Sequence, residues 1–198
     1  VGASGDLAPL SHMALPLIGF GEVHDGDRVI SGADALRRVG RSPIQLAEKE
    51  GLALINGTQI MTAVGLLALH DAVRIVKSAD ITCAITVEAL RGSERPFQAR
   101  VHEVRAHEGQ KATAANLRAL LSGSEVMKSH ANCSKVQDAY SMRSTPQVIG
   151  AAHDAVAYAK SQVEIELNGV GDNPIFFPEE DLTLTGANFQ GTPVAVPM

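Results

Sequence analysis

The chain has 198 residues, of which 45% are apolar and only 4% aromatic, and it contains no tryptophan. Its 22 acidic residues outnumber its 17 basic residues, giving a net charge of −5 with the histidines neutral. This balance argues against a nucleic-acid or anionic-membrane partner, and no apolar run is expected to span a bilayer. The aliphatic composition instead predicts closely packed helices in one large domain, or in part of one.

The first half of the chain is predicted to be helical apart from one hairpin. Helices are expected at 7–18, 33–39, 42–50 and from 58 to about 91. Pro9 and Pro16 make the first helix irregular, and Ser42-Pro43 begins the third. A β-hairpin with Asp25-Gly26 at its centre is expected at 22–30. The last of these helices is apolar on most faces, as in a central bundle helix, and a break near 78–80 is plausible.

The second half continues the helical pattern. Helices are predicted at 96–107, 111–121 and 146–167, with Gly109 separating the first two. Two short β-prone runs follow, at 175–177 and 182–185. The predicted fold class is therefore mainly α, a bundle of long helices with small β-hairpins.

The segment Ala3-Ser4-Gly5 is the most informative in the chain, because a backbone can cyclise on itself only between residues this small. The Gly5 amide nitrogen reaches the Ala3 carbonyl carbon only where side chains leave room. Loss of water from Ser4 would then leave an exocyclic methylene conjugated to the new ring, which is an electrophile. A serine before a helix is more commonly an N-cap, with Asp6 as a first-turn acid, so the tripeptide alone is a weak signal.

Four later segments support a functional interpretation of the tripeptide. They are Lys49–Gln59, Ser129–Val148, Asp172–Pro174 and Gly186–Phe189. In this order and spacing the chain resembles the aromatic amino acid lyases, and most closely their histidine-specific branch, over nearly its whole length. The resemblance implies a long-helix bundle of the aromatic amino acid lyase or fumarase-like type, with residues 1–198 as the central portion of a single catalytic domain.

The resemblance also implies the chemistry. Enzymes of this family build a 4-methylidene-imidazol-5-one group (MIO) from Ala-Ser-Gly, here Ala3, Ser4 and Gly5, and need no external cofactor. The matching Asp6 assists the cyclisation. Asn56 corresponds to an asparagine that hydrogen-bonds near the ring and the substrate amine, work that suits a carboxamide because it donates and accepts without adding charge. A turn or N-cap role is the structural alternative for Asn56.

Three further polar residues, Gln137, Tyr140 and Arg143, are spaced i, i+3, i+6, which on a helix places them along one side. By resemblance Arg143 holds the substrate carboxylate, for which a planar guanidinium is suited, and Tyr140 and Gln137 complete the pocket. Phe189 packs beside the ring and substrate. The structural alternatives are a solvated helix face for the three polar residues and a core position for Phe189.

The implied reaction removes ammonia from an α-amino acid to leave an α,β-unsaturated acid, with L-histidine as the favoured substrate. Gln190 is a departure, because histidine-specific relatives usually carry histidine there, and Gly171 replaces the usual serine or threonine. A phenylalanine or tyrosine ammonia-lyase and an aminomutase therefore stay open. The alternative from another functional class is a non-catalytic helical assembly protein that has kept the fold.

The remaining sequence features concern metal and phosphate binding, cellular location and oligomeric assembly. The seven histidines show no metal-ligand spacing, and no phosphate-binding loop is present. Cys83 and Cys133 are unpaired in sequence, which fits the reducing cytoplasm. Long helices with apolar residues on several faces predict a homo-oligomer, and the family is tetrameric with active sites shared between subunits. We expect the chain to be the middle of a longer enzyme, with the catalytic base and further specificity residues outside it.

Overall fold

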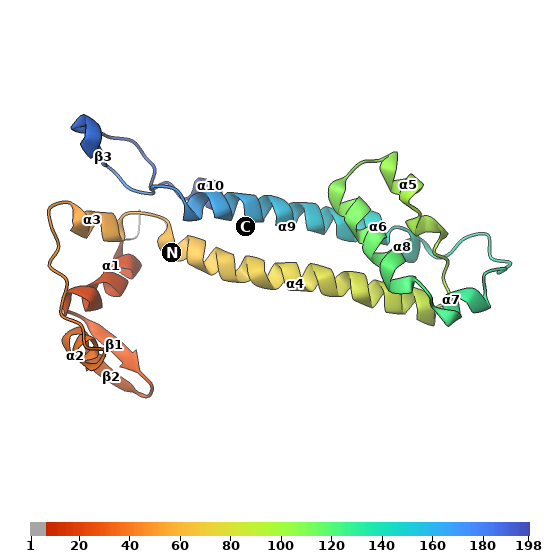
Figure 1. The fold of residues 1–198 in the computed structure, drawn as a ribbon, viewed down its shortest axis with the longest axis horizontal. Coiled ribbons are helices and arrows are strands. Elements are labelled where there is room, and N and C mark those ends of the chain that lie inside the picture. Colours follow the sequence, from red (N-terminus) through yellow and green to blue (C-terminus); the bar gives the residue numbers. More distant parts are fainter. Residues whose placement is uncertain (1–6) are drawn as a thin grey trace. The chain divides into compact units, whose positions relative to one another are not determined.

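The structure is a computed structural model that describes residues 7–198, and the chain divides into two compact units. One unit contains the residues up to Leu66 and from Gln162 onward, and the other contains Leu67–Ser161. The two longest helices, α4 (Gln59–Ala89) and α9 (Thr145–Leu167), contribute residues to both units (Figure 1). The mainly α fold class with small hairpins is confirmed.

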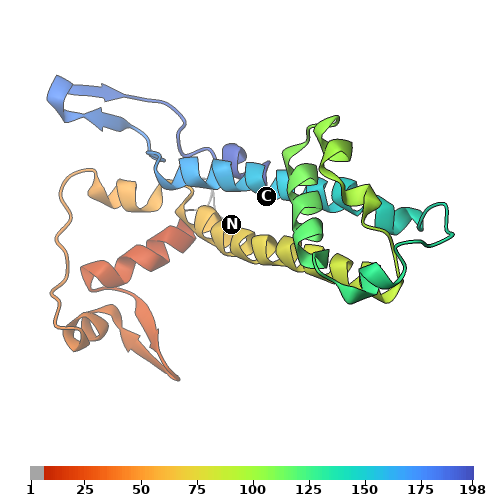
Figure 2. The same cartoon turned by 45° about the vertical axis from the view of Figure 1, so that its right-hand side comes forward.

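The first unit begins with the irregular helix that its prolines predict. Pro9 lies in the first turn of α1 (Ala8–Ala14), and Pro16 in the first turn of the 3-10 helix η1 (Leu15–Ile18). The hairpin β1 (Glu22–Asp25) and β2 (Arg28–Ser31) follows, and then α2 (Gly32–Arg38) (Figure 2). Asp25 pairs with Arg28, so the turn is Gly26-Asp27, one residue later than expected. Gly26 has a φ of 61°, which glycine adopts without strain.

The helix predicted at 42–50 is wrong: α3 comprises Glu50–Ile55 instead. The earlier segment is irregular, and the Ile44 backbone N–H within it donates to the Leu17 carbonyl at 2.9 Å. The Glu50 side chain accepts from the Ala47 backbone N–H at 2.7 Å, just before the helix. Helix α3 packs against α1.

The C-terminal part of the first unit contains the second predicted hairpin. Strands β3 (Ile175–Phe177) and β4 (Leu182–Leu184) pair antiparallel around the 3-10 helix η3 (Pro178–Glu180). A short helix, α10 (Thr192–Ala195), follows with Val194 buried. Gly65 of α4 leaves room for Met198, since a Cβ there would lie 1.9 Å from the Met198 methyl group.

The second unit contains parts of α4 and α9, which are linked there by the Cys83–Thr145 and Asp80–His153 hydrogen bonds, and several shorter helices. These are η2 (Arg95–Phe97), α5 (Ala99–Glu103), α6 (Glu108–Leu121), α7 (Glu125–Ser129) and α8 (Tyr140–Arg143). Of these, η2 and α5 pack on α6. The apolar core is aliphatic around one aromatic ring. Its members are Ala84, Val87, Phe97, Leu117 and Leu121.

Gly109 has a different role from the one its sequence suggests. It lies inside the first turn of α6, and the break between the helices falls at 104–107 instead. A Cβ on Gly109 would lie 2.1 Å from the Gly150 carbonyl oxygen of α9, and its N–H donates to Asp154 Oδ1 at 2.7 Å. Glycine is therefore needed for the close approach of α6 and α9.

Helix α4 runs without the break considered near 78–80. The Ser78 hydroxyl donates to the Arg74 carbonyl one turn earlier, so it does not compete with the helix. Asp80 is buried and its carboxylate is held by Asn116 of α6, at 2.7 Å, and by His153 of α9, at 3.2 Å. Ser78 is thus satisfied within the helix, and Asp80 is held through Oδ2 by two tertiary contacts, while its buried Oδ1 has no hydrogen-bond partner among the described residues.

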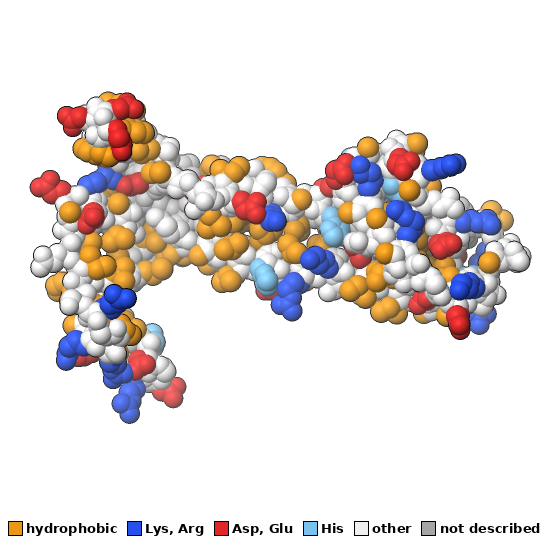
Figure 3. All heavy atoms as spheres, viewed as in Figure 1, with side chains coloured by type: hydrophobic (Ala, Val, Ile, Leu, Met, Phe, Trp, Pro, Cys, Tyr) orange, Lys and Arg blue, Asp and Glu red, His pale blue; other side chains and the backbone are white. Residues whose placement is uncertain are grey.

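The surface of α4 carries many exposed apolar side chains (Figure 3). Those beyond three-fifths exposure are Val64, Leu67, Ile75 and Ile85. The expectation that no apolar run could span a bilayer is wrong. In the part of the chain that is described, the helical stretch Glu50–Ala89 is long and apolar enough to do so by length and composition, with a mean hydropathy of 1.7 in its most apolar part. Core helices of soluble proteins satisfy the same criterion.

Candidate active site

The reactive tripeptide Ala3, Ser4 and Gly5, together with Asp6, lies outside the described residues. Leu7 is the first described residue, and its carbonyl accepts from the Ser11 hydroxyl at 3.0 Å at the beginning of α1. The other predicted site residues are all described, and they fall into two groups. Asn56 and Phe189 belong to the first compact unit, and Gln137, Tyr140 and Arg143 to the second.

Asn56 lies at the C-terminal end of α3, three residues before α4, and is buried at 9% exposure. Its backbone N–H donates to the Leu52 carbonyl at 2.9 Å. Its side-chain Nδ2 donates to Asp172 Oδ1 at 3.1 Å and to the Asn173 backbone carbonyl at 3.2 Å. The carboxamide is thus held by a segment more than a hundred positions away in the sequence.

Asp172 is the centre of this cluster. Its Oδ2 forms an ion pair with Lys49 Nζ, and its Oδ1 accepts from the Asn173 backbone N–H at 2.7 Å as well as from Asn56. Burial by itself raises the pKa of Asp172, but the hydrogen bonds from Lys49, Asn173 and Asn56 outweigh it and hold the pKa below its ordinary value. Asp172 is therefore a carboxylate at neutral pH.

Lys49 supports the cluster from an unusual backbone conformation. Its φ is 74°, in the left-handed region that residues with a side chain rarely adopt. Such a conformation costs on the order of 1 kcal/mol or more and persists where the surrounding contacts fix it. Here the ion pair to Asp172, 123 positions away, is one of those contacts.

Gly57 allows the segments of the cluster to approach closely. A Cβ on Gly57 would lie 2.6 Å from the Gly171 carbonyl oxygen, so only glycine fits there. A Cβ on Gly171 would meet only ordinary contacts, the nearest being the Asn188 carbonyl oxygen at 3.7 Å. Gly171 lies outside any helix or strand. Thr58 adds a hydrogen bond from its hydroxyl to Glu166 of α9.

Phe189 lies on a loop that is tied to the same cluster. The Asn173 side-chain oxygen accepts from the Gly186 backbone N–H at 2.7 Å, and Asn188 donates to the Val170 carbonyl at 3.3 Å. Phe189 is itself half-buried. Gln190, the residue that departs from the histidine-specific pattern, accepts from the Thr192 N–H and hydroxyl at the beginning of α10. Its carboxamide thus has a local capping role.

The predicted helical strip is wrong for Gln137, which lies in an exposed irregular segment before α8. The segment is held by Asp138, whose carboxylate accepts from the Ser93 backbone N–H at 2.6 Å. Only Tyr140 and Arg143 share a helical turn, with the guanidinium 5.9 Å from the Tyr140 ring centroid. Arg143 Nε donates to the Asp138 carbonyl at 2.9 Å, and its two terminal nitrogens have no partner among the described residues.

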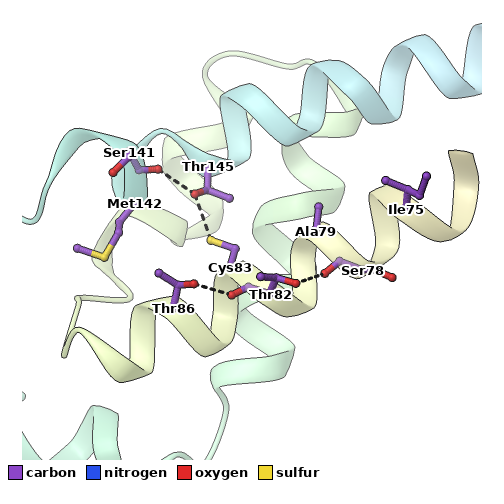
Figure 4. Close-up of a pocket in the computed structure, with 9 residues that line it drawn as sticks. All are labelled: Ile75, Ser78, Ala79, Thr82, Cys83, Thr86, Ser141, Met142 and Thr145. Carbon is purple, nitrogen blue, oxygen red and sulfur yellow. Dashed lines mark hydrogen bonds between the residues drawn. The ribbon is translucent and has the colours of Figure 1, made fainter.

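A cavity of about 510 Å³ lies in the second unit beside α8 (Figure 4). Figure 4 shows Ser141 and Met142 of α8 beside it, with Cys83 of α4 hydrogen-bonded to Thr145 at 3.1 Å. Burial raises the pKa of the Cys83 thiol, an effect that the Thr145 hydrogen bond opposes and the nearby Asp80 carboxylate reinforces. The thiol is therefore protonated at neutral pH and is a poor nucleophile.

Comparisons with known proteins identify the family of the chain. A family model described as aromatic amino acid lyase matches residues 1–198. The chain belongs to the aromatic amino acid lyase family. It is 55% identical to a histidine ammonia-lyase of Sorangium cellulosum and 52% identical to one of Gloeobacter violaceus, over 99% of this chain in both cases. The chain spans 39% and 38% of the length of these two relatives.

Solved structures share the lyase fold. A histidine ammonia-lyase from Trypanosoma cruzi matches all of the chain with a TM-score of 0.85 and 39% identity, and the chain covers 37% of it. A tyrosine aminomutase from Streptomyces globisporus matches all of the chain with a TM-score of 0.88 and 42% identity, and the chain covers 41% of it.

Sequence reasoning did not assign a role to Lys49 or Asp172, although both stand inside motifs that carry the family resemblance. A usable signal was present, because Lys49 begins one motif and Asp172 begins the other, and their charges are opposite. His130, also inside a family motif, has a structural role. Its Nδ1 lies 2.7 Å from the Val126 carbonyl oxygen, and its Nε2 lies 2.7 Å from the Gly92 carbonyl oxygen.

Proposed function

We propose that the protein containing this chain is an ammonia-lyase that eliminates ammonia from L-histidine to give urocanate. The observation that carries the proposal is the 55% and 52% identity to proteins named histidine ammonia-lyases, over 99% of the chain. The motif that holds the buried Asn56 supports it, because this cluster joins two of the segments that carry the family resemblance.

The prosthetic group in this proposal is MIO, formed from Ala3, Ser4 and Gly5 with the help of Asp6. It supplies an electrophile that no standard side chain offers. The described residues fit a site that holds an amino acid beside such a group: Asn56 is buried, yet its Oδ1 accepts no hydrogen bond from any residue that the structure describes. We expect no metal and no external cofactor.

The chain's own residues bind and orient the substrate. Arg143 clamps the carboxylate through its two terminal nitrogens, because its Nε is already engaged with Asp138. Asn56 accepts from the amino group, and Phe189 packs against the ring of the substrate. Tyr140 and Gln137 complete the pocket. The base that takes the β-proton lies outside this chain, so the isolated segment is expected to be inactive.

A homotetramer in the cytoplasm, with active sites shared between subunits, is part of the same proposal. The support is the apolar surface of α4, where side chains such as Leu67, 70% exposed, are well suited to burial against another subunit. Light scattering of the full-length protein tests it: a monomer at micromolar concentration contradicts the shared sites.

The decisive assay is product formation by the full-length protein with three amino acids. L-histidine should give the urocanate absorbance, whereas a phenylalanine or tyrosine lyase gives cinnamate or coumarate, and an aminomutase gives a β-amino acid. If the full-length protein releases ammonia from none of the three amino acids, the proposal is wrong. Gln190 accepts hydrogen bonds from Thr192, so this assay, and not the residue at 190, distinguishes a histidine from an aromatic substrate.

An intact mass separates the lyase from a non-catalytic assembly protein of the same fold. Cyclisation between Ala3 and Gly5 releases one water and dehydration of Ser4 releases a second, which lowers the mass by about 36 Da. An unmodified mass in a folded full-length sample favours the non-catalytic protein.

A further inference from the structure

The carboxamide of Asn56 is held in one orientation by its partners. Both partners of Nδ2, the Asp172 carboxylate and the Asn173 backbone carbonyl, are oxygens that can only accept hydrogen bonds. A carboxamide turned by 180° would bring its own oxygen against these two oxygens. The amide nitrogen must therefore face Asp172, which leaves Oδ1 as the one hydrogen-bonding atom of the side chain without a partner among the described residues.

Asp172 is in turn fixed by groups other than Asn56. Lys49 Nζ pairs with Oδ2, and the Asn173 N–H donates to Oδ1 at 2.7 Å. The Asp172 side chain is 16% exposed and that of Lys49 is 30% exposed, so the pair is only partly screened by water. The carboxylate consequently stands in place before any substrate is bound.

We propose that Asp172, held by Lys49, is a positioning residue that orients the Asn56 carboxamide so that its oxygen accepts a hydrogen bond from the amino group of the substrate. This inference rests on the proposed ammonia-lyase function. An oxygen at this place attracts an ammonium or amine and repels a carboxylate, so Asn56 selects ligands that carry an amino group. The carboxylate of the substrate is bound instead by the guanidinium of Arg143, which can only donate hydrogen bonds.

The test uses the full-length enzyme with Asp172→Asn, which keeps the shape of the side chain and removes its charge. Lys49 attracts the remaining oxygen, the new amide nitrogen faces Asn56, and the Asn56 carboxamide turns over. We expect kcat/KM for the amino acid that the wild type deaminates best to fall about 10- to 100-fold, the loss of a hydrogen bond to a charged group.

A second ligand distinguishes positioning from general damage. The corresponding acid without the amino group, 3-(imidazol-4-yl)propanoate for histidine or 3-phenylpropanoate for phenylalanine, does not use the Asn56 oxygen. Its inhibition constant should stay within about twofold of the wild-type value in Asp172→Asn. Equal weakening of the amino acid and the amino-free acid, or an unchanged kcat/KM, overturns the positioning role.

Two controls complete the design. Asp25→Asn removes an exposed ion pair with Arg38 and should leave both constants unchanged. If Asp172→Asn fails to mature by intact mass, Lys49→Met and Lys49→Arg are compared instead: Lys49→Met should lose kcat/KM selectively, and Lys49→Arg should restore it. Equal activity of the two lysine variants overturns the inference. A wild type inactive on all three amino acids refutes the proposed function itself, and the inference falls with it.

Discussion

Replacement of Gly57 by alanine should abolish most of the activity of the full-length enzyme. The new Cβ would lie 2.6 Å from the Gly171 carbonyl oxygen and 2.5 Å from the Gln59 side chain, of which only the second is flexible enough to give way. Ordinary contacts begin at 3.4 Å. The backbone segments at 57 and 171 must therefore separate by about 0.8 Å.

This separation acts directly on the Asn56 cluster. Asn56 and Gly57 are adjacent, as are Gly171 and Asp172, so the displacement falls on the 3.1 Å hydrogen bond between Asn56 and Asp172. An added 0.8 Å, as a rough figure, takes that contact beyond hydrogen-bonding range. A displacement of about 1 Å near a reacting group costs roughly 100-fold in rate, and we expect a loss of this order in kcat/KM.

The assay is steady-state deamination by the full-length enzyme, with an intact mass to confirm dehydration of Ser4 and a melting curve to confirm folding. Gly171→Ala is the matched control, since its Cβ meets nothing closer than 3.7 Å and its activity should stay within about twofold of wild type. The reasoning is refuted if Gly57→Ala keeps a third or more of the wild-type kcat/KM, or if both variants are equally impaired.

Three further predictions concern other parts of the chain. Gly109→Ala should lower the free energy of unfolding by about 1–3 kcal/mol or more in a denaturant titration, because its Cβ would lie 2.1 Å from the Gly150 carbonyl, whereas Gly51→Ala in α3 should be neutral or stabilising. Arg143→Lys should raise KM about 10-fold or more, since an ammonium cannot clamp a carboxylate with two parallel bonds; an unchanged KM places the carboxylate elsewhere. The pKa of Asp172 is lower in the folded protein than its ordinary 3.8, so its contribution to stability is complete above that value and is lost as the pH falls below it. The melting temperature of Asp172→Asn should therefore fall less steeply than that of the wild type as the pH is lowered. An equally steep fall contradicts the lowered pKa of Asp172.

Local signals in the sequence predicted most of the elements. The helix expected at 146–167 is α9, which begins one residue earlier, and both β-prone runs pair as a hairpin. These elements depend on hydrophobic periodicity and on turn or helix-breaking residues close by in the chain, which a sequence displays directly. The same holds for Pro9 and Pro16, each in the first turn of a short helix.

Three of the errors concern segments that contact residues distant in the chain. The Ile44 N–H donates to the Leu17 carbonyl, and the segment that Ser42-Pro43 predicted to be helical is irregular. The Asp138 carboxylate accepts from the Ser93 N–H, 45 positions away, and Gln137 beside it lies outside any helix. Gly109 has the composition of a helix break, but its contact with Gly150 places it within α6.

The candidate site divides in the same way. The sequence by itself determined which residue types are available: a cyclisable Ala3-Ser4-Gly5, a neutral carboxamide at 56 and a guanidinium at 143. Only the tertiary structure decided that Lys49 and Asp172, 123 positions apart, meet at Asn56 and engage its amide nitrogen, so that no described residue bonds to its oxygen. Hydrogen-bond polarity depends on which groups face each other in space, and no periodicity along the chain encodes that.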